Sequence, residues 1–275
     1  MPGPERRATR ARVSSLAWIA IASALLSGQT KPNPDDGFTD TPMLPGLPWH
    51  VHDPARPHPK VVTPGLQPGQ PPSDANVLFD GKNLSKWTSA KLGTAAAPWK
   101  IHDGYFEVSP GSGDIATKEK FGDVQLHVEW MEPPEIKGTS QNRGNSGVFL
   151  MGLFEIQVLD SYNSRTYADG QAGAIYGQWP PLANAVRPPG EWQTYEIVFE
   201  APRFQGDKLS KRAAVTVFLN GVLLHNRKEV MGPTIYRQVP KYVKGPSEGP
   251  LVLQDHGHPA RYRNIWIRSI GGYDR

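Results

Sequence analysis

Beyond residue 75 the chain consists of short segments in which apolar and polar residues alternate, separated by turn-forming residues. Such alternation is typical of β-strands with one buried face. No long amphipathic helical stretch and no repeat of roughly 20–50 residues accompanies it. The clearest predicted strands are Val124–Trp130, Gly147–Leu150, Glu155–Leu159, Trp192–Phe199, Ala214–Leu219, Leu251–Gln254 and Asn264–Ile270. We therefore expect one antiparallel all-β sandwich over residues 75–271, with a two-residue hairpin turn at Asn220-Gly221.

Successive side chains on a strand point to opposite faces of the sheet, so the position along each strand assigns a residue to a face. The residues that this rule places in the core include Trp130, Val148, Ile156, Val158, Val217 and Ile265. The polar residues that it places on the opposite faces include Glu129, Asn145, Glu155, Gln157, Gln254 and His256. These groups either line a groove that binds sugar hydroxyls or form an ordinary solvated face. Gly144 and Gly147 favour the groove, because a missing side chain in a strand permits close approach of a ligand.

The N-terminal part of the chain has a different pattern. Four arginines precede an apolar run from Val13 to Leu26, which predicts a secretory signal over residues 1–28 and export to the periplasm or the cell exterior. The run is about 14 residues long, short of the roughly 20 that span a bilayer, although an uncleaved signal remains an alternative. We expect residues 29–74, which are rich in proline, to form a linker or a strap against the domain.

Charge and cysteine content exclude several classes of function. The net charge is +4, and the arginines before the apolar run supply most of it. The folded part therefore has no basic excess, and we expect no nucleic-acid ligand. The chain has no cysteine, which excludes disulfides and thiolate metal sites. The oligomeric state is not readable from these features.

Six segments in order resemble the 3-keto-disaccharide hydrolase domain family. They are Phe79–Trp87 (FDGKNLSKW), Arg143–Tyr162, Gly173–Gly177 (GAIYG), Glu191–Phe199 (EWQTYEIVF), Val217–Asn226 and Gly249–Ile270. The resemblance covers about residues 75–271 and implies a concanavalin A-like jelly-roll sandwich, related to laminarinases, with a concave carbohydrate-binding face. It also implies a hydrolase that acts on 3-keto-glycosides.

Two kinds of chemistry are compatible with these residues. Ordinary glycoside hydrolysis uses two carboxyl groups, but Gln157 occupies the position two after Glu155, so Glu129 would have to supply the second acid. The resemblance implies another route, in which a base removes the C2 proton next to a C3 ketone and the C1 substituent is eliminated. Glu155 or His256 is the candidate base.

Further residues are candidates for substrate binding. Those candidates are Arg143, Asn145, Gln157, Tyr176, Gln254 and Arg263, with Trp179 as an alternative aromatic platform. Asp255, His256 and His258 are either a turn or ligands of a divalent metal. A carbohydrate-binding module without turnover is the main alternative to an enzyme. A buried carboxyl with a perturbed pKa in the groove would favour the enzyme.

Overall fold

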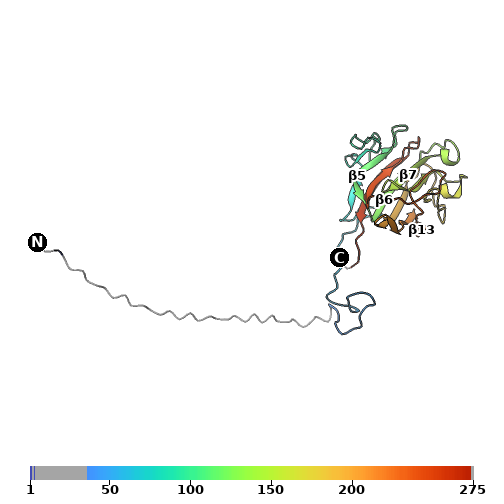
Figure 1. Ribbon diagram of the computed structural model, residues 1–275. Helices are drawn as coiled ribbons and strands as arrows, with labels where there is room; N and C mark the ends of the chain where they lie inside the picture. Colours follow the sequence, from blue (N-terminus) through green and yellow to red (C-terminus); the bar gives the residue numbers. More distant parts are fainter. Residues whose placement is uncertain (2, 4–35, 274–275) are drawn as a thin grey trace. The chain divides into compact units, whose positions relative to one another are not determined.

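The computed structural model describes residues 1, 3 and 36–273 (Figure 1). The predicted signal segment falls almost wholly outside the described residues. The chain divides into two units, Met1–His58 and Pro59–Arg275. In the first unit Met43 and His50 form an isolated antiparallel bridge, and the Leu44 amide donates a hydrogen bond to the Trp49 carbonyl. Within the described part of the chain, no helix has the length and apolarity that a membrane span requires.

The second unit contains two large antiparallel sheets, and Figure 1 labels β6 and β13 of one and β5 and β7 of the other. Seven strands of the eight-stranded sheet follow the order β13 (Val222–Glu229), β12 (Ala214–Leu219), β9 (Gln193–Glu200), β6 (Val124–Met131), β15 (Arg261–Ser269), β4 (Phe106–Glu107) and β3 (Lys100–Ile101). The eighth strand, β1 (Asn76–Phe79), pairs with β15 outside this order. The five-stranded sheet has the order β2 (Trp87–Ser89), β5 (Ile115–Phe121), β14 (Gly249–Leu253), β7 (Asn145–Leu150) and β8 (Phe154–Leu159). β10 (Arg203–Gln205) and β11 (Lys208–Lys211) form a separate hairpin, and Ser140–Asn142 and Ala168–Gly170 form short 3₁₀ turns.

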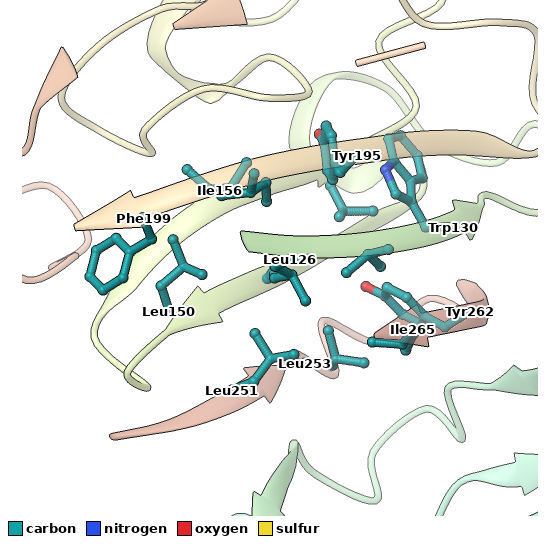
Figure 2. Packing of buried hydrophobic residues seen from close by; sticks show 14 of the residues in the cluster. Leu126, Trp130, Leu150, Ile156, Tyr195, Phe199, Leu251, Leu253, Tyr262 and Ile265 are labelled. Carbon is teal, nitrogen blue, oxygen red and sulfur yellow. The ribbon is translucent and has the colours of Figure 1, made fainter. Parts of the chain in front are cut away.

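Apolar side chains from the inner faces of both sheets form the core. In Figure 2, Leu126, Trp130 and Tyr195 of the larger sheet lie near Leu150 and Ile156 of the smaller sheet. The six predicted core residues are all at most 1 % exposed. The expected all-β antiparallel jelly-roll sandwich is therefore confirmed; burial alternates along β9 as the sequence pattern required, whereas β8 is buried on both faces.

The predicted strands are present, with bounds that differ by a few residues. β7 begins at Asn145, two residues before the predicted start, so Asn145 and Ser146 belong to the strand. The hairpin turn between β12 and β13 is also confirmed. Asn220 and Gly221 have φ angles of 52° and 82°, and this left-handed pair matches the twist of the flanking strands.

The last part of the Pro-rich segment lies along the outer face of the larger sheet. The Gly69 carbonyl accepts hydrogen bonds from Asn264 Nδ2 and Trp266 Nε1, both at 2.8 Å, and Asp74 pairs with Arg268 at 2.6 Å. This strap, residues 63–74, explains why His127 is fully buried although its strand position points it away from the core.

Candidate functional site

A cavity of about 530 Å³ lies on the outer face of the five-stranded sheet. β7, β8 and the end of β14 form its floor, and four loops form its walls. Its lining residues are Ser140, Gln141, Asn142, Asn145, Phe149, Glu155, Gln157, Tyr167, Tyr176, Thr234, Tyr236, Gln254 and His256. Six of the residues singled out in the sequence are among them, namely Asn145, Glu155, Gln157, Tyr176, Gln254 and His256.

Strand register explains this convergence. Gly147 of β7 pairs with Gln157 of β8, and the Gln254 amide donates a hydrogen bond to the Gly147 carbonyl at 3.0 Å. Gln254, Gly147 and Gln157 therefore form a row across the sheet, and Glu155 lies in the next row opposite Phe149. A Cβ atom on Gly147 would come within 2.7 Å of Glu155 Oε1, so the glycine leaves room for the carboxyl group.

Glu155 is the titratable group at the centre of this arrangement. Its side chain has no hydrogen bond to another described residue and is only 4 % exposed. Burial raises the pKa of Glu155 to about 8, and the nearby charge of Asp114 adds to the effect. Burial also raises the pKa of Asp114, whose Oδ1 accepts a hydrogen bond from the Asp255 amide at 2.8 Å. At neutral pH the carboxyl group of Glu155 can therefore exchange a proton with a ligand in the cavity.

An amide network holds the polar floor in place. Gln157 Nε2 donates hydrogen bonds to Gln141 Oε1 at 3.1 Å and Asn145 Oδ1 at 3.2 Å, and Asn145 Nδ2 donates to the Gln141 carbonyl at 2.8 Å. The buried Oε1 atoms of Gln157 and Gln254 have no partner among the described residues. Unpaired buried acceptors are costly, so sugar hydroxyls that donate to them would bind favourably.

Tyrosines form one wall of the cavity. The hydroxyls of Tyr167 and Tyr176 are 2.8 Å apart. Burial raises the pKa of Tyr176, and its contact with Tyr167 adds to this, so the hydroxyl stays protonated and can donate a hydrogen bond. Tyr236 also lines the cavity and is 66 % exposed.

The segment from Asp255 to Pro259 is mainly a structured loop. Asp255 Oδ1 accepts from the Gly257 amide and its Oδ2 from the Gly113 amide, both at 2.9 Å, so its carboxyl group stabilises the loop. His256 is exposed, lines the cavity and stacks on His258 with ring centroids 6.0 Å apart. Across residues 36–273, no group of three or more His, Asp or Glu side chains is placed to hold a metal ion.

Glu129 and Arg263 lie away from the cavity, on the outer face of the larger sheet. Arg263 Nε donates to Glu129 Oε2 at 2.6 Å, and its guanidinium stacks on Trp192 at 4.1 Å. Burial alone would raise the pKa of Glu129, but hydrogen bonds from His127, Asn264 and Arg263 hold it at about 2. Glu129 therefore cannot form a catalytic pair with Glu155, which lies on the other sheet.

Arg143 and Trp179 are also absent from the cavity lining. Arg143 donates to Asp160 at 2.7 Å and to the Tyr162 carbonyl at 2.9 Å, so these bonds hold its guanidinium outside the cavity lining. The ring of Trp179 is covered by Lys228 Nζ, 3.4 Å from the ring centroid, and cannot serve as a free platform.

Sequence reasoning missed several residues of the site. They are Asp114, which interacts with Glu155, and the lining residues Ser140, Gln141, Asn142, Phe149, Tyr167, Thr234 and Tyr236. All but Phe149 lie outside the predicted strands, where alternation gives no signal. Asp114 directly precedes β5, and its electrostatic interaction with Glu155 of β8 depends on how strands distant in the sequence pair in the sheet.

Comparison with known proteins places the chain in a family. A crystal structure of a candidate glycosyl hydrolase from Parabacteroides distasonis ATCC 8503 shares 48 % identity and covers 83 % of this chain and 100 % of its own, with a TM-score of 0.76. A second from the same organism, at 20 % identity and a TM-score of 0.53, covers 72 % of this chain and 94 % of its own and shows the same fold. No curated protein sequence matches. Residues 74–268 match the 3-keto-alpha-glucoside-1,2-lyase-like domain, which confirms the sequence resemblance, and the chain belongs to that family.

Proposed function

We propose that the protein cleaves glycosides that carry a ketone at C3 of the sugar, and that Glu155 is the base. The observation that carries this proposal is the carboxyl group of Glu155, which is buried, has no side-chain hydrogen bond within the described protein and lines a polar cavity. A pKa of about 8 gives it the basicity that proton abstraction near neutral pH requires. Family membership and the similar candidate glycosyl hydrolase support a carbohydrate substrate.

The reaction follows from the acidity of the C2 hydrogen beside a C3 ketone. Glu155 takes the C2 proton, and the electron pair left on C2 forms a double bond to C1. The bond from C1 to the departing oxygen breaks, and that oxygen leaves with its electron pair and takes a proton from water, while Glu155 releases the C2 proton to water. Water then adds across the double bond and gives the free 3-keto sugar. The family description, a 1,2-lyase, agrees with elimination across C1 and C2.

The other lining residues can support this chemistry. The unpaired amide oxygens of Gln157 and Gln254 would accept hydrogen bonds from sugar hydroxyls. Tyr167 and Tyr176 share one hydrogen bond, so one of the two protonated hydroxyls would donate to an oxygen that gains negative charge as the C1 bond breaks. His256, exposed at the same cavity, is the alternative base.

The test compares a 3-keto-disaccharide with its unoxidised parent, using the wild type, Glu155→Gln and Glu129→Gln. We expect the wild type to cleave only the oxidised sugar. Glu155→Gln keeps the shape of the side chain but removes its basicity, so the rate should fall roughly 10²–10⁴-fold while binding is retained. Glu129→Gln, on the other sheet, should retain the wild-type rate. Full activity of Glu155→Gln would reject Glu155 as the base and direct the same test to His256.

A second candidate is ordinary two-carboxylate glycoside hydrolysis by Glu155 and Asp114. The observation that favours it is the electrostatic interaction between these two carboxyl groups: burial is the main cause of the raised pKa of Glu155, and the charge of Asp114 adds to it. It predicts equal cleavage of the oxidised and the unoxidised sugar, whereas elimination requires the ketone.

A further inference from the structure

A second cavity of about 460 Å³ adjoins the first. Tyr167, Tyr176 and Tyr236 line both, so these side chains form the boundary between them. Each volume falls within the roughly 300–1,000 Å³ of small-molecule pockets. Together the two cavities can receive a ligand with two parts joined near the tyrosine hydroxyls.

The walls of the two cavities differ in chemistry. The first offers amide, carboxyl, hydroxyl and imidazole groups, which suit a sugar. The second adds Ile235 and Val239 to the tyrosine rings, and its charged lining residues are Asp169 and Arg237. Exposed aliphatic side chains beside aromatic rings gain free energy when they cover an apolar group. Ile235 and Val239 gain more from covering a flat aromatic ring than from a hexose, whose hydroxyls require polar partners.

The loop that carries these apolar residues is held in place. It spans residues 230–248, between β13 and β14. The Thr234 amide donates to the Leu153 carbonyl at 2.8 Å, Gln178 Nε2 donates to the Gly232 carbonyl at 2.9 Å, and the Tyr242 hydroxyl donates to the Val230 carbonyl at 2.8 Å. These hydrogen bonds hold the loop on both sides of residues 235–239, which lowers the entropic cost of ordering those residues around a ligand.

We infer that the second cavity is the leaving-group subsite and takes an aromatic aglycone. This inference rests on the proposed function, because it requires the sugar ring to occupy the first cavity. The C1 substituent then passes the Tyr167–Tyr176 hydroxyl pair and enters the adjoining space. Its flat ring packs against Tyr236, Ile235 and Val239.

The first test uses two 3-keto-glucosides of the same anomeric configuration, one phenyl and one methyl. Val239→Asp places a charge against the phenyl ring and should lower kcat/KM for the phenyl substrate at least about tenfold, equivalent to about 1.4 kcal/mol. The value for the methyl substrate should stay within about twofold, because a methyl group does not reach the subsite. Val243→Asp is the matched control: Val239 and Val243 are 83 % and 79 % exposed on the same loop, and Val243 lines neither cavity. An equal loss on both substrates, or the same loss in Val243→Asp, would overturn the inference.

The second test does not depend on turnover. Calorimetry compares the binding of unoxidised phenyl glucoside and methyl glucoside to the wild type and to Val239→Asp. We expect the phenyl compound to bind about tenfold more tightly, through burial of its ring, and Val239→Asp to remove that advantage. Equal affinities in the wild type would overturn the subsite. A phenyl advantage without cleavage of either 3-keto-glucoside would support the subsite and reject the proposed reaction.

Discussion

Glu155 links the structure to a pH dependence of the reaction. Its pKa is raised to about 8, so its base form accumulates only as the pH rises through that value. We expect kcat/KM to increase from pH 6 to about pH 9 in a pH–rate profile. Asp114→Asn removes a neighbouring negative charge, and Asn can still accept the Asp255 amide, so the rising limb should move to lower pH. A kcat/KM that falls across this range would show that Glu155 acts as an acid.

Glu132 predicts a pH dependence of stability. It is fully buried, and neither of its carboxyl oxygens has a partner within the described protein, so burial raises its pKa from 4.5 to about 8. The folded state keeps a proton that the unfolded state releases above about pH 4.5. The free energy of unfolding should therefore fall as the pH rises from about 4.5 to 8, by up to about 5 kcal/mol from this group.

Denaturant unfolding at pH 5.5 and 8.5 tests this contribution. Glu132→Gln cannot ionise, so its free energy of unfolding should change much less between the two pH values than that of the wild type. Glu135→Gln is the control, because Glu135 is exposed on the same loop. An unchanged pH dependence in Glu132→Gln would contradict the assignment.

At the scale of the elements, β7 is the strand that makes room for the site. Gly147→Ala would bring a methyl group within 2.7 Å of Glu155 Oε1 and 2.8 Å of Phe149 Cε2. Both contacts are with ends of side chains, which can move, so the fold should survive. The displaced carboxyl group should lower kcat/KM at least about tenfold, since misplaced catalytic groups are costly.

The control for this substitution is Gly245→Ala, where an added Cβ meets nothing within 4 Å. Its kcat/KM should equal that of the wild type. Thermal unfolding of both variants separates a local effect from a loss of the fold. Wild-type kcat/KM in Gly147→Ala would mean that Glu155 need not occupy its observed position for catalysis.

The positions of the strands can be predicted from the sequence, because each strand or turn is determined by residues that are neighbours in the chain. Alternation assigned Val148 and Ile156 to the core, and Asn220-Gly221 defined a turn whose left-handed backbone the structure shows. The pairing of distant strands is not local. The position of Asp114 near Glu155 depends on β5 and β8 lying in the same sheet, with β14 and β7 between them. A local pattern contains no information of that kind.

At the scale of the whole domain, each sheet has polar groups on its outer face, and only one of the two faces forms the candidate site. On the larger sheet the strap covers His127, and Arg263 neutralises Glu129. On the smaller sheet loops surround Glu155 and leave a cavity. Strand position predicts the same alternation for both sheets, so alternation alone could not distinguish Glu129 from Glu155. The difference arises from segments without regular structure.

The fate of the hydrogen on C2 tests the proposed reaction most directly. A 3-keto-glycoside with deuterium at C2 is cleaved in ordinary water, and the product is analysed by mass spectrometry and NMR before it exchanges. Product incubated alone with the enzyme controls for exchange after cleavage. Elimination and hydration predict that deuterium is lost from C2 of the product in step with cleavage. Cleavage with complete retention of deuterium at C2 would contradict the account.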